Sequence, residues 1–145
     1  MKGRFFICLI LGVGAALSAV LMAQAASSTR DGVYTEAQAK QGQALYTTQC
    51  AMCHGAHLEG AAQNPALAGQ AFLQNWQGQT LGDFYTQIKA TMPAIKPGSL
   101  QPDQVTQLIA YILSVNKYAA GKTDLPSSAD ELKAIQFDPP AAAGQ

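Results

Sequence analysis

The five residues Cys50-Ala51-Met52-Cys53-His54 constrain this chain more than any other stretch of its 145 residues. Two cysteines separated by two residues and followed directly by histidine form the attachment signature of c-type haem. On a helical turn, residues three apart lie on one face, so both thiols can add to the two vinyl groups along one haem edge. His54 then lies where a ring nitrogen can bind the iron. We therefore expect covalent haem c, anchored by Cys50 and Cys53, with His54 as an axial ligand.

Three other chemistries use the same residue types and stay open as alternatives. A zinc site could use Cys50, Cys53, His54 and His57, but structural zinc sites usually take two ligand pairs separated by a dozen or more residues. A redox-active dithiol needs a strand, a turn and a helix around the cysteine pair, and the sequence shows no such pattern. A structural disulfide would close only a very small loop. The haem interpretation is favoured over all three.

The opposite axial position can be assigned by elimination. Besides two methionines near its start, the chain has Met52 and Met92, and its histidines are His54 and His57. Met52 lies inside the attachment motif, and His57 lies one helical turn beyond His54, so neither easily reaches the other haem face. Met92 is followed by Pro93, which holds the chain out of a helix and suits an exposed ligand loop. We expect Met92 to be the second axial ligand, the alternative being a methionine that fills a gap in the core.

Histidine and methionine ligation indicates the kind of chemistry. A thioether opposite an imidazole raises the reduction potential relative to two imidazoles, and it leaves no coordination position open for a substrate. The sequence contains no glycine-rich nucleotide motif, no nucleophile elbow and no second metal cluster. We therefore expect one-electron transfer rather than an enzyme. A peroxidase-like enzyme or a haem-based sensor, the less favoured alternatives, would require the methionine to leave the iron.

The first 25 residues form a separate unit. Lys2 and Arg4 precede an apolar stretch over residues 5–22, and the small-residue sequence Ala-Gln-Ala ends at residue 25. This order is typical of a secretory signal peptide, which predicts export to the periplasm. An apolar stretch of roughly 18 residues could instead stay in place as a membrane anchor.

The remaining chain of about 120 residues has the size of one small domain. Without the two leader cations, seven basic residues stand against nine acidic ones, and no basic run suggests nucleic-acid binding. Capping patterns and apolar spacing predict helices near residues 36–47, 71–75, 81–91 and 102–116. We expect an all-α fold in which the loop between the first two of these helices wraps around the haem.

Four short motifs follow one another along the chain. They are Gly42-x-x-x-Tyr46-x-x-x-Cys50, Cys50-x-x-Cys53-His54-Gly55, Pro65-x-Leu67-x-Gly69 and Met92-Pro93. Between residues 36 and 116 the chain thus resembles a monohaem class I cytochrome c. The resemblance implies a small fold of three to four main helices around one covalent haem. It also implies that the N- and C-terminal helices cross, with Gly42 against residues 108–111, because glycine lets two backbones approach closely.

The same resemblance suggests two supporting residues around the haem. The carbonyl of Pro65 would accept a hydrogen bond from the far ring nitrogen of His54, which would orient the imidazole and raise its basicity. Trp76 would either donate its indole N–H to a haem propionate or pack in the wall without that bond.

A narrower similarity concerns redox partners. Several segments are similar to the cytochrome domains of quinoprotein (PQQ) alcohol dehydrogenases, namely residues 72–76, 80–93, 97–100 and 120–126. This similarity implies a dehydrogenase as electron donor and an oxidase or another cytochrome of the respiratory chain as acceptor. The alternative is a cytochrome subunit of a quinoprotein dehydrogenase complex. Lys89 and Lys96 flank the expected ligand loop and could steer an acidic partner, although their apolar neighbours favour an apolar docking surface.

These observations divide the chain into four parts. We expect a signal peptide over residues 1–25, a short linker over 26–34, the cytochrome c domain over 35–118 and a C-terminal extension over 119–145. A capping-box pattern at Ser128 predicts a short helix in the extension. This helix could pack on its own domain or on a dehydrogenase, and membrane contact is expected only if the leader is retained.

Overall fold

The computed structural model describes residues 28–140, so the expected leader lies outside the described residues. The elements in chain order are η1 (Thr29–Asp31), α1 (Glu36–Gln49), α2 (Ala51–His54), α3 (Gln70–Trp76), α4 (Leu81–Thr91), α5 (Pro102–Val115) and α6 (Ala129–Leu132). Extended pairing in this part of the chain is limited to isolated bridges. The expected all-α fold is confirmed. Among the described residues, no helix is both long enough and apolar enough to cross a membrane.

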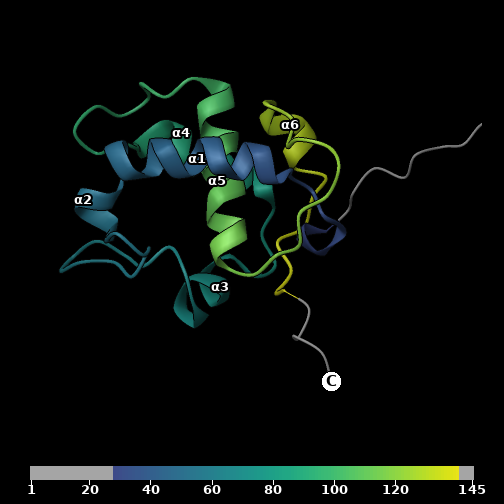
Figure 1. Cartoon of the computed structure of the whole chain (residues 1–145), viewed down its shortest axis with the longest axis horizontal. Helices are drawn as coiled ribbons and strands as arrows, with labels where there is room; N and C mark the ends of the chain where they lie inside the picture. Colours follow the sequence, from purple (N-terminus) through teal and green to yellow (C-terminus); the bar gives the residue numbers. More distant parts are fainter. Residues whose placement is uncertain (1–27, 141–145) are drawn as a thin grey trace, which may run out of the picture.

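The helices α1 and α5 cross at close range, as the resemblance implied (Figure 1). A Cβ atom added at Gly42 would lie 1.8 Å from the carbonyl oxygen of Gln107 and 2.9 Å from Cβ of Tyr111. Only glycine therefore fits at this crossing. One turn further along α1, the ring of Tyr46 packs against that of Tyr111 with their centroids 5.3 Å apart.

The helix starts follow their capping residues. The Thr35 side chain accepts a hydrogen bond from the Gln38 N–H at 3.1 Å and begins α1. Thr80 and Asp83 form a reciprocal capping box that begins α4. Side chains that satisfy these otherwise unpaired N–H groups specify where each helix starts, and this explains why sequence alone located α1 and α4.

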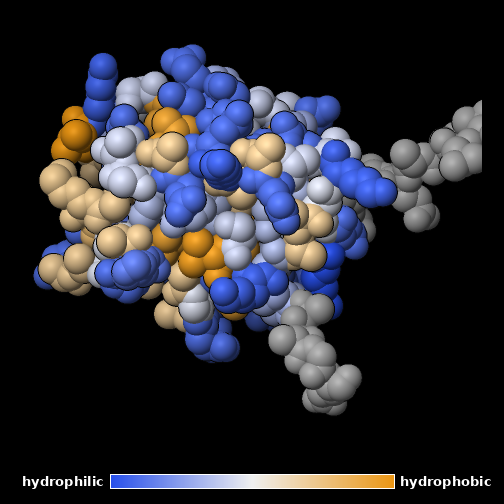
Figure 2. All heavy atoms as spheres, in the orientation of Figure 1, coloured by the Kyte–Doolittle hydropathy of each residue, from blue (hydrophilic) through white to orange (hydrophobic). Residues whose placement is uncertain are grey.

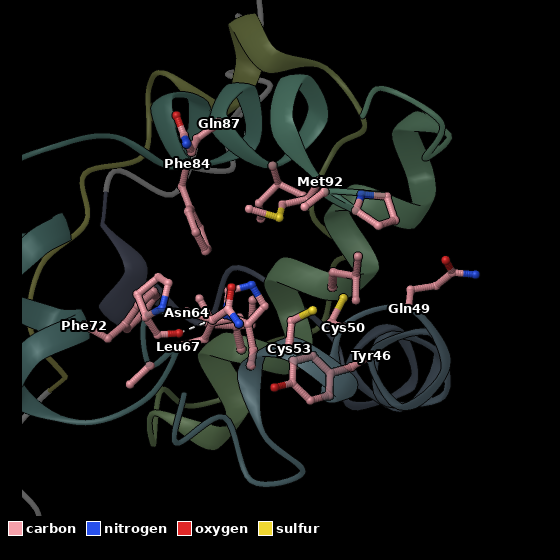
Figure 3. A pocket seen from close by; sticks show the side chains of 18 of the residues that line it. Tyr46, Gln49, Cys50, Cys53, Asn64, Leu67, Phe72, Phe84, Gln87 and Met92 are labelled. Atoms are coloured by element: carbon pink, nitrogen blue, oxygen red, sulfur yellow. Dashed lines mark hydrogen bonds between the residues drawn. The ribbon is translucent and has the colours of Figure 1, made fainter. Parts of the chain in front are cut away.

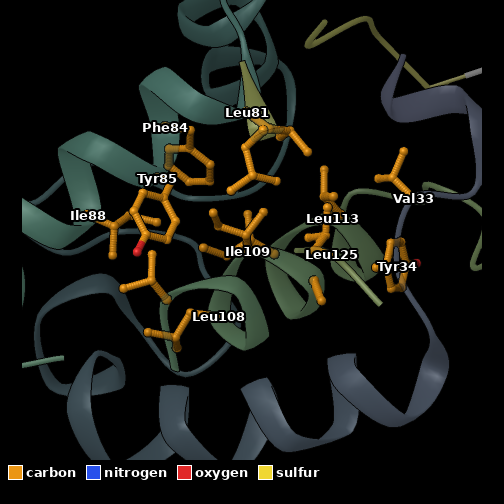
Figure 4. Close-up of a cluster of buried hydrophobic side chains, with 14 of the residues drawn as sticks. Val33, Tyr34, Leu81, Phe84, Tyr85, Ile88, Leu108, Ile109, Leu113 and Leu125 are labelled. Atoms are coloured by element: carbon orange, nitrogen blue, oxygen red, sulfur yellow. The ribbon is translucent and has the colours of Figure 1, made fainter. Parts of the chain in front are cut away.

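The apolar faces of α4 and α5 point toward each other within the hydrophobic core, as Figure 4 shows. The buried apolar side chains of these two helices are Leu81, Phe84, Tyr85, Ile88, Val105, Leu108, Ile109, Ala110, Ile112 and Leu113. Burial of each large apolar side chain contributes roughly 1.5–3 kcal/mol. This core gives α4 a firm base, and α4 in turn carries Met92 at its C-terminal end.

Residues 28–34, the described part of the expected linker, pack on the domain. The backbone N–H of Thr29 donates to the carbonyl of Gln136 at 2.9 Å. The hydroxyl of buried Tyr34 donates to the carbonyl of Tyr118 at 2.6 Å. This part of the expected linker is ordered because it pairs with a segment about a hundred residues away, which no local pattern reveals.

The C-terminal extension folds back over its own domain, which is one of the two arrangements that the sequence left open. The buried Gln38 side chain donates to the carbonyl of Leu125 at 3.1 Å and accepts from its N–H at 2.9 Å. The short helix α6 lies against α4, where a Cβ at Gly82 would come within 2.8 Å of the Ala129 carbonyl oxygen. The expected capping bond of Ser128 is not formed, and α6 is only four residues long.

Candidate functional site

A cavity of about 300 Å³ opens between α2, α3 and the C-terminal end of α4. Its lining contains every site residue predicted from the sequence, namely Cys50, Cys53, His54, Pro65, Trp76 and Met92. Figure 3 shows the sulfur atoms of Cys50 and Cys53 on one side of the cavity and the Met92 sulfur across from them. The fold thus brings together residues that lie in four separate segments of the sequence.

The two cysteines reach the cavity through a tight junction of α1 and α2. Cys50 ends α1 by donating its N–H to the Tyr46 carbonyl at 2.9 Å, and it then begins α2. Both Cys50 and Cys53 are free thiols and are half-buried. Burial, and then the neighbouring Cys53, raise the pKa of Cys50 to about 11. A thiol so reluctant to ionise differs from the low-pKa cysteine of a redox-active dithiol.

His54 is held in one orientation by a single strong contact. Its Nδ1 lies 2.8 Å from the carbonyl oxygen of Pro65, and the side chain is 7% exposed. Because a carbonyl oxygen can only accept, Nδ1 carries the proton and donates, which leaves Nε2 as the nitrogen with a free lone pair. This is the arrangement in which a neutral imidazole binds a metal while its other nitrogen is fixed by a carbonyl.

The loop that carries Pro65 is fixed from two directions. The Leu67 N–H donates to the carbonyl of Leu58 at 2.8 Å, and Leu58 is completely buried. From α5, Asn116 donates to the Leu67 carbonyl at 2.9 Å and accepts from the Gly69 N–H at 3.0 Å. Sequence reasoning placed Asn116 only at the end of a helix. The sequence gives only a weak signal for this role, because an asparagine that will be buried looks the same as any other polar residue that follows an apolar helix.

Met92 lies where α4 ends. Its backbone is extended, with φ −116° and ψ 151°, while its N–H still donates to the Ile88 carbonyl at 2.9 Å. The following loop is closed by Lys89, whose Nζ donates to the carbonyls of Gly98, at 3.0 Å, and Leu100. Lys89 therefore holds the loop after Met92, a structural role that the sequence-based idea of a steering charge did not include.

Three aromatic side chains, Phe72, Trp76 and Phe84, form one wall of the cavity. Trp76 lies on Phe84 with ring centroids 4.4 Å apart, and Phe72 meets the same ring edge-on at 5.6 Å. All three side chains line the cavity. The structure thus brings Trp76 to the site in a packing role, and such pairs contribute about 0.5–1.5 kcal/mol beyond their buried area.

The cavity is lined by apolar and polar side chains, with no Asp, Glu, Lys or Arg among them. Apart from His54, Tyr46 and Trp76, its polar side chains are the amides of Gln49, Asn64, Asn75 and Gln87. Met52 and Ile95 also line it and are 84% and 83% exposed. Figure 2 shows less hydrophilic side chains gathering over α2 and the loop between α4 and α5, while the rest of that face is a mixture of hydrophilic and hydrophobic side chains.

The donor set of this cavity matches one cofactor. Two thiols lie beside an imidazole with a free Nε2, a thioether faces them, and apolar side chains surround the space. Soft sulfur and imidazole donors suit iron in haem. In the part of the chain that the structure describes, no three His, Cys, Asp or Glu side chains gather as a metal site, as the zinc alternative would need.

Fold and site together define a class I cytochrome c, the class that the sequence resembled. A family model described as cytochrome c oxidase, cbb3-type, subunit III matches residues 37–112, more than half of the chain. The chain belongs to this family. Membership implies haem c as cofactor and electron transfer as the general role.

Two curated relatives are cbb3-type cytochrome c oxidase subunits CcoP. The protein of Azospirillum brasilense is 34% identical over 91 residues, which cover 52% of this chain and 30% of that protein. The protein of Azospirillum sp. (strain B510) is 34% identical over 105 residues, covering 57% of this chain and 34% of that protein. The chain thus spans about a third of the length of these relatives.

One solved structure is also similar, the sulfane dehydrogenase SoxCD from Paracoccus pantotrophus. The superposition has a TM-score of 0.48 and 20% sequence identity, and it covers 89% of this chain and 68% of that chain. This similarity is too low to support a conclusion about function. Since the relatives are named as oxidase subunits, the narrower relation to quinoprotein dehydrogenases stays a proposal.

Proposed function

We propose that this cytochrome carries single electrons through one haem c, attached to Cys50 and Cys53 and ligated by His54 and Met92. The observation that supports this most is the pairing across one cavity of His54, with its Nδ1 bound to the Pro65 carbonyl, and Met92. The carbonyl contact would leave Nε2 of His54 to bind the iron, and the extended backbone at the end of α4 would let the Met92 thioether bind from the other side.

The chain's own residues would shape the electron transfer. Haem supplies a one-electron iron couple when bound. The Pro65 carbonyl makes His54 a stronger donor, and the Met92 thioether favours the reduced state. Phe72, Phe84 and the other apolar side chains of the lining exclude water from the cavity. With both axial positions filled, no site remains for a substrate.

The proposed redox partners rest on the side chains around the cavity and on the names of the relatives. We propose that electrons arrive from a periplasmic dehydrogenase and leave to the respiratory chain, through an oxidase or another cytochrome. The oxidase-subunit names of the relatives support an oxidase on the acceptor side. A cytochrome subunit of a quinoprotein dehydrogenase complex is the alternative. The lining has no Asp, Glu, Lys or Arg, and its Met52 and Ile95 side chains are exposed. These features favour docking of a redox partner through apolar contacts, with an affinity that depends little on salt.

The proposed location is the periplasm. The leader-like residues 1–25 support export, and a retained leader would attach the domain to the membrane. In this proposal the functional unit extends from the packed residues 28–34 through the C-terminal extension, because both ends contact the cytochrome domain.

The decisive experiment compares substitutions of the two methionines that line the cavity, Met92 and Met52. The protein would be produced in a host that attaches c-type haem, and its visible and near-infrared spectra recorded oxidised and reduced. We expect one haem per chain, low-spin, with the weak iron–sulfur charge-transfer band in the oxidised state. Met92→Leu should abolish this band and Met52→Leu should keep it. A band that survives Met92→Leu would refute the ligand assignment.

The same spectra test the less favoured functions. A haem-based sensor or a peroxidase-like enzyme would bind carbon monoxide or peroxide at the iron of the unsubstituted protein, with Met92 released from the iron. The hydrogen bonds that close the loop after Met92 argue against such easy release. A chain that matures without any haem would instead support the non-haem cysteine alternatives.

A further inference from the structure

Phe137, in the C-terminal extension, lies behind the aromatic wall of the cavity. It is 1% exposed. Its ring centroid lies 5.8 Å from Phe72, 6.3 Å from Trp76 and 6.0 Å from Phe84, and these three side chains line the cavity. Phe137 itself does not line the cavity. It therefore contacts the wall from the side opposite to the space where haem would lie.

The backbone around Phe137 is tied to the turn that joins α3 and α4. The Phe137 N–H donates to the Gln79 carbonyl at 2.8 Å, and the Gly78 N–H donates to the Phe137 carbonyl at 3.4 Å. Two residues earlier, the Ile135 carbonyl accepts from the Leu81 N–H at 2.9 Å. The extension is thus bonded at the point where the two wall-bearing helices meet.

A second support comes from the end of α5. The ring of Tyr118 meets Phe137 edge-on with centroids 6.0 Å apart, and the Tyr118 hydroxyl donates to the Asp138 carbonyl at 2.6 Å. One side of the Phe137 ring therefore contacts Tyr118, and the other side contacts the aromatic wall of the cavity. Rings packed in this way have little freedom to move, so the wall cannot retreat from the cavity without displacing Phe137.

We propose that Phe137 is a positioning residue that holds Trp76 and Phe84 against the haem and thereby raises the midpoint potential. The inference rests on the proposed function, since it requires haem in this cavity. The oxidised haem iron carries one more positive charge than the reduced one, and water stabilises that charge. An intact wall keeps water away from this side, which favours the reduced state.

The test compares truncations at two buried positions of the extension in the haem-loaded protein. Phe137→Ala removes the support, Phe137→Leu retains part of it, and Leu125→Ala is the matched control. Leu125 is 3% exposed, its backbone bonds to Gln38 of α1, and in Figure 4 it lies away from Phe84. The midpoint potential would be measured by spectroelectrochemical titration and the stability by denaturant unfolding.

We expect Phe137→Ala to lower the midpoint potential, Phe137→Leu to lower it less, and Leu125→Ala to lose stability at an unchanged potential. An unchanged potential in Phe137→Ala would overturn the proposal, and so would an equal drop in Leu125→Ala. If Phe137→Ala does not fold, an unchanged potential in Phe137→Leu has the same meaning. The iron–sulfur band of the unsubstituted protein tests Met92 separately, so failure of that ligand assignment leaves the comparison of potentials valid.

Discussion

The histidine side and the methionine side of the cavity are held by different forces. On the histidine side, polar contacts dominate: the Pro65 carbonyl holds His54, and Asn116 holds the loop around Leu67. On the methionine side, Met92 ends α4, the helix that also carries Phe84, whose ring packs on Trp76 and on Phe137. Directional hydrogen bonds suit the task of orienting a ligand, whereas ring packing suits the exclusion of water.

The difference also concerns distance along the chain. On the histidine side, the contact between His54 and Pro65 joins residues eleven positions apart. The wall on the methionine side depends on Phe137, which comes from the far end of the chain. The contact that orients His54 is therefore local, although Asn116 from a distant segment also holds its loop, while the aromatic wall requires the end of the chain to be folded.

The largest expected effect comes from the packed side. Phe72→Ala should lower the free energy of unfolding by about 3–5 kcal/mol, because the side chain is 2% exposed and contacts both Phe84 and Phe137. The haem should stay attached, since its anchors lie on the other side. Denaturant unfolding of the haem-loaded protein measures the loss. Leu73→Ala, at a half-buried position of the same helix, is the control and should cost clearly less.

A smaller effect is expected on the polar side. Asn116→Ala removes three hydrogen bonds, to the Leu67 carbonyl, the Gly69 N–H and the Ile112 carbonyl. Because this side chain is buried, its loss should lower the free energy of unfolding by about 2–3 kcal/mol. Hydrogen exchange at the Gly69 amide should speed up, whereas Asn64→Ala, an exposed amide in the same loop, should change neither quantity. A larger loss for Asn116→Ala than for Phe72→Ala would contradict the proposed division between the two sides.

Sequence could locate what depends on neighbouring residues. The caps at Thr35 and Thr80 predicted where α1 and α4 begin, and the resemblance to class I cytochromes c predicted that Gly42 lies at the crossing with α5. The attachment motif and the methionine-proline pair predicted two opposite sides of one cavity, which the fold then brought together.

Sequence could not locate what depends on distant pairing. The bonds of Gln38 with Leu125 and of Thr29 with Gln136 join ends of the chain that carry no matching local signal. The capping pattern at Ser128 did predict a helix, but tertiary contacts limit it. Shortly after α6 the Ile135 carbonyl accepts a hydrogen bond from the Leu81 N–H, so the chain there pairs with the start of α4 and does not continue the helix.

The smallest expected effect tests whether a local cap matters on the packed side. Hydrogen bonds from the Thr80 hydroxyl, at 2.7 Å, and from the Thr80 N–H, at 2.9 Å, lower the pKa of Asp83 below its ordinary value of 3.8. Because the folded-state pKa is lowered, the carboxylate contributes stability above that ordinary value, and the contribution is lost as the pH falls through the lowered pKa.

Asp83→Asn should therefore lower the free energy of unfolding by about 1 kcal/mol or less at neutral pH, and by progressively less in acid. Unfolding curves recorded from pH 7 down to about pH 3 measure this difference. Asp103→Asn removes a first-turn charge of α5 and serves as the control. The iron–sulfur band should stay unchanged in Asp83→Asn, because Met92 at the other end of α4 is held by packing and by the loop that Lys89 closes. Loss of the band would show that the cap, and not the wall, positions the methionine.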